Sequence, residues 1–108
     1  MEYLVTMTTH VPAGTPEEAV QDIRTREAAH SRELAAQGHL LRLWRPPLQP
    51  GDGRALGLWQ ARDAAQMQEI LEALPLAPWM TVDTTPLSPH PSDPAIIHPP
   101  ATAPTGTP

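Results

Sequence analysis

One long helix constrains the fold of this chain more than any other feature of the sequence. The segment Thr15-Pro16-Glu17-Glu18 is typical of a helix N-terminus, with Thr15 as the N-cap and proline at the first helical position. The chain then runs without glycine or proline to Gln37, and Gly38 is a natural C-terminal stop. The sequence therefore predicts a helix over residues 16–37.

Four other segments have the pattern of β-strands: residues 2–10, 39–45, 54–60 and 79–84. The first alternates clearly, with Tyr3, Val5 and Met7 on one side. The proline- and glycine-rich segment 46–53 must be a loop, and it joins the second and third strands into an antiparallel hairpin. In the second strand, alternation predicts Leu40, Arg42 and Trp44 on one face and Leu41, Leu43 and Arg45 on the other.

A second helix is expected to begin at the cap Asp63 and to end at Pro75–Pro78, with an apolar stripe made of Met67, Ile70, Leu71 and Leu74. The order βαββαβ predicts an α+β domain over residues 1–93, with one antiparallel sheet and two helices on one face. Trp44 and Trp59 cannot both point at the helices without crowding, so a homo-oligomer is expected to cover the other face. Residues 94–108, rich in proline, alanine and threonine, are expected to form a flexible C-terminal tail.

The composition excludes several kinds of chemistry. There is no cysteine, and all seven basic residues are arginines, so thiol nucleophiles and lysine Schiff bases are absent. The net charge of −5 argues against a nucleic-acid partner. No apolar run approaches the length of a membrane span, and no secretion signal is visible, so a cytoplasmic protein is expected. The histidines lack metal-ligand spacing, and no metal site is expected.

Glu27 is the residue that stands out within the long helix. At about 100° per residue, Ile23, Glu27, His30 and Leu34 project within about 60° of one another, whereas Arg24 and Arg32 point away or towards the flanks. A helix that buries Ile23 and Leu34 therefore carries Glu27 inward. Burial disfavours the charged form of a carboxylate, which suits it to take and return a proton near neutral pH. The alternative is a carboxylate at a subunit contact or at the edge of the stripe, hydrogen-bonded to His30.

Three segments carry a resemblance to a known family. Residues 26–45, from Arg26-Glu27-Ala28 to Leu43-Trp44-Arg45, resemble the muconolactone Δ-isomerase family, as do Leu74-Pro75-Leu76-Ala77-Pro78-Trp79-Met80 and Thr85–Pro91. The likeness extends over about residues 1–93. It implies a ferredoxin-like fold, assembly into large homo-oligomers that are typically decamers, and a reaction without a cofactor.

The family's reaction belongs to the β-ketoadipate branch of catechol degradation. It converts muconolactone to 3-oxoadipate enol-lactone by moving a ring double bond through proton transfer. The resemblance implies Glu27 as the catalytic base, and His30, on the same helical stripe, is the second residue expected at the catalytic site. Arg45 or Arg42 is expected to bind the substrate carboxylate, and Trp44 and His90 to line the substrate pocket. Arg45 is favoured over Arg42, because it lies at the end of the strand where the loop begins.

The chain departs from the family at Ala28 and His30, which replace a lysine and a tyrosine. Two other functions therefore stay open beside the isomerase. One is a small monooxygenase-type enzyme of ferredoxin-like topology. The other is a non-catalytic oligomeric binding protein that has kept the fold.

Overall fold

The computed structural model describes residues 1–47 and 53–97. Its elements are β1 (Glu2–Thr9), α1 (Glu17–Ala36), β2 (Leu40–Trp44), β3 (Arg54–Gln60), α2 (Ala64–Glu72), a 3₁₀ turn (Ala77–Trp79), β4 (Met80–Leu87) and α3 (Pro94–Ile97). This order confirms the predicted βαββαβ arrangement. The last strand extends three residues beyond the predicted end, and the middle of the predicted loop, 48–52, lies outside the described residues.

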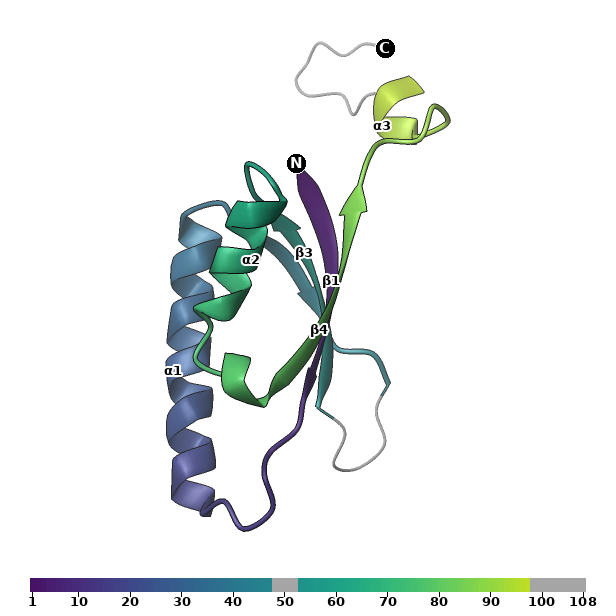
Figure 1. Cartoon of the computed structure of the whole chain (residues 1–108). Helices are drawn as coiled ribbons and strands as arrows, with labels where there is room; N and C mark the ends of the chain where they lie inside the picture. The colour runs from purple at the N-terminus through teal and green to yellow at the C-terminus, as the bar shows by residue number, and fades with distance from the viewer. Residues whose placement is uncertain (48–52, 98–108) are drawn as a thin grey trace, which may run out of the picture.

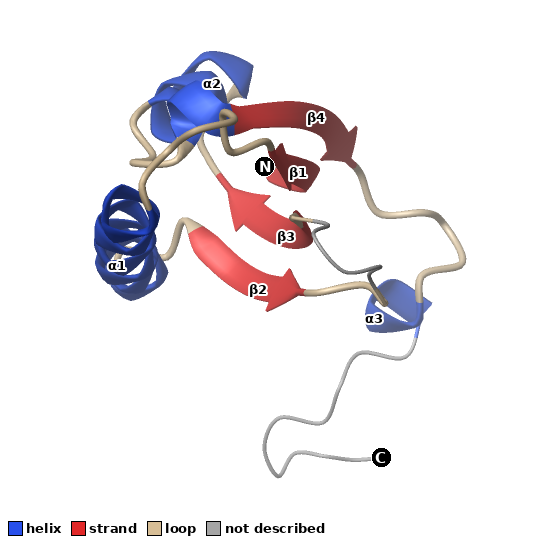
Figure 2. Ribbon diagram, turned by 90° about the horizontal axis from the view of Figure 1, so that it is seen from below, coloured by secondary structure: helices blue, strands red, loops and turns tan. Residues whose placement is uncertain are grey.

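The strands form one antiparallel sheet in the order β2-β3-β1-β4. Both α1 and α2 lie on the same face of this sheet (Figures 1 and 2). Within the described ranges, no helix is long and apolar enough to cross a membrane. The other face of the sheet carries Leu4 and Thr6 of β1, Leu56 and Leu58 of β3, and Arg42 and Trp44 of β2. We refer to these six residues as the open face.

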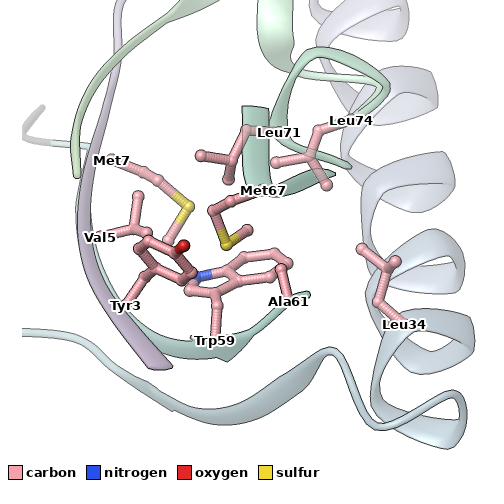
Figure 3. Packing of buried hydrophobic residues seen from close by; sticks show 9 residues of the cluster. All are labelled: Tyr3, Val5, Met7, Leu34, Trp59, Ala61, Met67, Leu71 and Leu74. Atoms are coloured by element: carbon pink, nitrogen blue, oxygen red, sulfur yellow. The ribbon is translucent and has the colours of Figure 1, made fainter. Parts of the chain in front are cut away.

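The core lies between the sheet and the helices. It is built from Tyr3, Val5 and Met7 of β1, Trp59 and Ala61 at the end of β3, Leu34 of α1, and Met67, Leu71 and Leu74 of the α2 region (Figure 3). The register pairs Tyr3 with Trp59 and Val5 with Gly57, so the alternating pattern of β1 points its apolar residues at the helices as predicted.

Two local features differ from the expectations. The residue that caps α1 is Pro16, which offers no side-chain cap, while the Thr15 hydroxyl donates to the Pro12 carbonyl at 2.6 Å. In β2, the register shifts between Leu40 and Arg42, so Leu40 pairs with Trp59 on the helix-covered face. The strict alternation predicted for this strand is therefore wrong at Leu40, because an irregularity of the bulge type reverses the facing of the residues that follow it.

The chain leaves the sheet after Leu87 and reaches α3 on the side away from α1 and α2 (Figure 2). Pro94–Ile97 form this short helix, which lies within the segment that the sequence predicts to be a flexible tail. The rest of that segment, 98–108, lies outside the described residues.

Gly57 leaves the space that the Trp59 indole occupies. A Cβ atom at position 57 would meet the indole Nε1 at less than van der Waals distance. We expect Gly57→Ala to destabilise the fold by about 1–3 kcal/mol, since the indole would have to leave its place in the core. Thermal unfolding measures this change. Gly57→Ala in a Trp59→Phe background is the control: the smaller ring should relieve the clash, and strictly additive losses would contradict this account.

Candidate functional site

A cavity of about 620 Å³ lies between α1 and the sheet. Its helical wall consists of Arg24, Glu27, Ala28 and Ser31. These residues are spaced i, i+3, i+4 and i+7, which places them on one face of a helix. The opposite wall comes from the three strands beneath α1 and from the segment before β4, and it includes Met7, Thr9, Leu40, Leu43, Arg45, Ala55, Trp59, Leu76 and Met80.

Among the described residues that line this cavity, Glu27 is the only carboxylate, and it is half-buried. The helical stripe predicted from the sequence explains its position, because the core residue Leu34 and the half-buried Ile23 anchor the helix on either side of it. The prediction that Glu27 turns inward is confirmed.

A backbone group holds this carboxylate in place. The N–H of Leu76 donates to Glu27 Oε1 at 2.9 Å. Leu76 occupies the third position of a type I turn, with φ −82° and ψ −4°, and the turn is closed by the Ala77 N–H donating to the Leu74 carbonyl at 2.9 Å. The proline before Leu76 suits the second position of such a turn. The turn does not use the Leu76 N–H itself, so this group is free to donate to Glu27.

The hydrogen bond leaves the two carboxylate oxygens unequal. Oε1 accepts from Leu76, and Oε2 has no hydrogen-bond partner among the described residues. A carboxylate held by one oxygen with the other free is suited to exchange a proton with a ligand in the cavity.

The two candidate arginines of the hairpin lie on opposite sides of the sheet. Arg45 lines the cavity with Glu27. Arg42 pairs with Leu58 on the open face, where its Cζ atom lies 5.0 Å from the centroid of the Trp44 ring. Arg45, which is favoured from the sequence, therefore lines the same cavity as Glu27, whereas Arg42 and Trp44 do not.

The two candidate histidines lie outside the cavity. His30 is half-buried, and its Nδ1 atom lies 3.9 Å from the exposed carboxylate of Glu33, on the same helix. His90 follows β4, where its Nδ1 accepts from the Ser92 N–H at 2.9 Å. Neither histidine lines the cavity, and among the described residues neither is hydrogen-bonded to Glu27.

Three groups that line the site were not singled out from the sequence. Arg24 and Ser31 lie one turn before and one turn after Glu27, and the helical spacing could have identified them. The Leu76 N–H has no sequence signal of its own, because every residue except proline carries this group.

Comparisons with known proteins agree on one family. The sequence profile described as muconolactone delta-isomerase matches residues 1–93. The muconolactone Delta-isomerase of Cupriavidus pinatubonensis is 32% identical to this chain over 92 residues, which cover 85% of this chain and 97% of that protein. The corresponding protein of Acinetobacter baylyi is 30% identical, over 85% of this chain and 93% of its own length.

Solved structures support the same fold. A crystal structure of muconolactone isomerase superposes with a TM-score of 0.76 at 24% identity, covering 85% of this chain and 93% of that one. A 5-chloro-2-hydroxyhydroquinone dehydrochlorinase from Burkholderia phenoliruptrix superposes with a TM-score of 0.54 at 13% identity, covering 79% and 93%. At these identities the two structures bear on the fold alone, and they confirm the ferredoxin-like α+β architecture.

The hydrogen bond from Leu76 predicts different stabilities for two variants of Glu27. Glu27→Gln keeps a carbonyl oxygen that can accept from Leu76, so its free energy of unfolding should stay within about 0.5 kcal/mol of the wild type. Glu27→Ala leaves a part-buried N–H without a partner and should lose about 1–2 kcal/mol. Urea unfolding of the two variants measures the difference. Equal stabilities would show that the bond contributes nothing.

Proposed function

This chain belongs to the muconolactone Δ-isomerase family, and on that premise we propose that it converts muconolactone to 3-oxoadipate enol-lactone without a cofactor. The observation that carries the proposal is the half-buried carboxylate of Glu27, which lines a cavity of about 620 Å³ together with Arg45. The cavity thus combines one base with a cation on the opposite wall, as an anionic lactone requires.

In this proposal Glu27 performs both proton transfers. Its Oε2 takes the proton from the γ carbon of the lactone, the ring electrons shift, and the same oxygen returns a proton to the α carbon. The Leu76 N–H keeps Oε1 fixed throughout, so the carboxylate does not need to be repositioned between the two steps. His30 takes no step, because it lies beside Glu33 and outside the cavity.

Arg45 is assigned to the substrate carboxylate. Its guanidinium can form two parallel hydrogen bonds to a carboxylate, and it has no ion-pair partner among the described residues. Arg42 and Trp44 belong to the open face, and we assign them to subunit contacts.

Assembly of several copies is also part of the proposal. Trp44 is 41% exposed on the open face, beside Leu56 and Leu58 on β3. A second copy packed on this face would remove these side chains from water. Ile96 of α3 is 53% exposed and adds a further apolar side chain that a second copy could cover. The resemblance of the sequence to a family that forms large homo-oligomers favours an assembly larger than a dimer. We place this oligomer in the cytoplasm, where a small catabolic lactone would be formed and consumed.

The test of the function is the isomerisation of muconolactone by the purified chain. We expect Glu27→Gln to lower kcat by about 10²-fold or more, since the amide cannot take the proton. Glu33→Gln is the matched control, because Glu33 lies on the same helix with its side chain 70% exposed, and its rate should not change. Unchanged turnover in Glu27→Gln would remove Glu27 from the mechanism. A wild-type chain that binds the lactone without turnover would instead support the non-catalytic binding protein.

The two arginines of the hairpin provide a second test. Arg45→Met should lower kcat/KM for muconolactone at least about 30-fold, which corresponds to the loss of a charge-assisted pair to a carboxylate. Arg42→Met should leave kcat/KM nearly unchanged and should weaken packing around Trp44 instead. Steady-state kinetics of both variants shows which arginine binds the substrate carboxylate. Loss of substrate affinity in Arg42→Met would contradict the assignment of Arg45 to this carboxylate.

Sedimentation at micromolar concentration tests the assembly. The wild-type chain should sediment as a species larger than a dimer, and Trp44→Asp should shift it to smaller species by placing a charge in the contact. Glu33→Arg, on the outer side of α1, serves as a control for the change of charge. A monomeric wild type would contradict the proposed assembly.

A further inference from the structure

Arg24 is a cation of the cavity that the proposed reaction has not yet used. It lies one turn before Glu27 on the same helical wall. Its neighbour Arg26 is occupied by an ion pair with Asp22 at 3.1 Å, and Arg62 lies 3.7 Å from Asp63. Arg24 has no ion-pair partner among the described residues, so its charge is available to a ligand.

The cavity is lined by more positively charged side chains than are needed to bind the single carboxylate of the substrate. Three arginines, Arg24, Arg45 and Arg54, line it against the one carboxylate of Glu27. Arg54 pairs with Thr8 at the end of the β1–β3 ladder, next to the Met7–Ala55 pair that faces α1. Because side chains alternate along a strand, the Arg54 side chain leaves the sheet on the side away from α1. Arg24 and Arg45 therefore remain as two cations on opposite walls of one cavity.

The proposed isomerisation generates a second negative charge. When the Cγ–H bond breaks, its electron pair forms a double bond from the γ to the β carbon. The former α–β pair moves to the bond between the α carbon and the carbonyl carbon, and the carbonyl oxygen becomes an oxyanion. Return of the proton from Glu27 to the α carbon reverses this last shift, so atoms and electrons balance without a co-reactant. The substrate carboxylate occupies Arg45, and the oxyanion still needs a partner.

We propose that Arg24 stabilises this oxyanion, an inference that rests on the proposed function of the site. Residues three apart on one helix face lie about 5–6 Å from each other. This spacing suits a five-membered lactone that places its α and γ carbons at Glu27 and its carbonyl oxygen towards Arg24. Charge that develops only during the reaction is stabilised most effectively by a group already in position.

The experiment compares kcat and KM in three variants of the full chain. Arg24→Gln should lower kcat by about 10- to 100-fold, a moderate loss because Arg24 is exposed and its charge is partly screened by solvent. KM should change by less than about threefold, because the oxyanion is absent from the bound substrate. Arg24→Lys should recover most of the loss, because it restores the charge. Arg32→Gln is the control, since Arg32 lies on α1 outside the cavity and its rate should equal that of the wild type. An unchanged kcat in Arg24→Gln, or a change confined to KM, would overturn the role of Arg24 and leave the proposed function intact.

A binding measurement separates this inference from the proposed function. Tetronate, a planar lactone anion, resembles the charged intermediate, and an unsubstituted butenolide resembles the neutral ring. Calorimetry should show tetronate binding about tenfold more weakly to Arg24→Gln than to the wild type, with equal butenolide binding. This result would support the anion contact even if the wild-type chain failed to isomerise muconolactone. Equal tetronate affinities in the two proteins would overturn it.

Discussion

The burial of Trp59 is the interaction on which both the core and the cavity depend. Its indole is 2% exposed, lies over Gly57, and shares the core with Tyr3 and Met67 (Figure 3). The same ring lines the cavity that contains Glu27. A large rigid side chain in this position fixes the distance between the sheet and α1, because protein interiors are closely packed and transmit such constraints. The site is therefore formed at the border of the core, and the turn at Leu76 and the strand end at Arg45 complete it.

The sequence predicts the order of the elements because each one has a strong local signal. Alternation identifies β1, the Pro16 and Gly38 boundaries identify α1, and Asp63 caps α2 by accepting from the Gln66 N–H at 2.9 Å. The inward position of Glu27 follows from helical periodicity alone. Arg45, the hairpin arginine that the sequence favours, lines the cavity, although the strict alternation predicted for β2 is wrong at Leu40.

The remaining features of the site depend on information that a single sequence does not express. The irregularity in β2 lies between Leu40 and Arg42, and nothing in the sequence Leu40-Leu41 indicates which of these leucines faces the helices. The contact from Leu76 comes from a backbone group whose position is set by a turn 49 residues away from Glu27 along the chain. Arg24 and Arg32 are both exposed on α1, and helical spacing places Arg24 nearer to Glu27, but only the folded structure shows that Arg24 lines a cavity. His30 and His90 share segments with residues of the site, but their side chains find partners elsewhere.

The two walls of the cavity differ in how freely they can change during evolution. The sheet wall is part of the core, so a substitution at Trp59 or Met7 alters the stability of the whole domain. The helical wall is backed by solvent: Ala28 is exposed and Ser31 is half-buried, and neither belongs to the core. Substitutions at these two positions can reshape the space beside Glu27 at little cost in folding free energy. Relatives with this architecture can thus acquire new substrate preferences through one face of α1 while the scaffold beneath it stays the same.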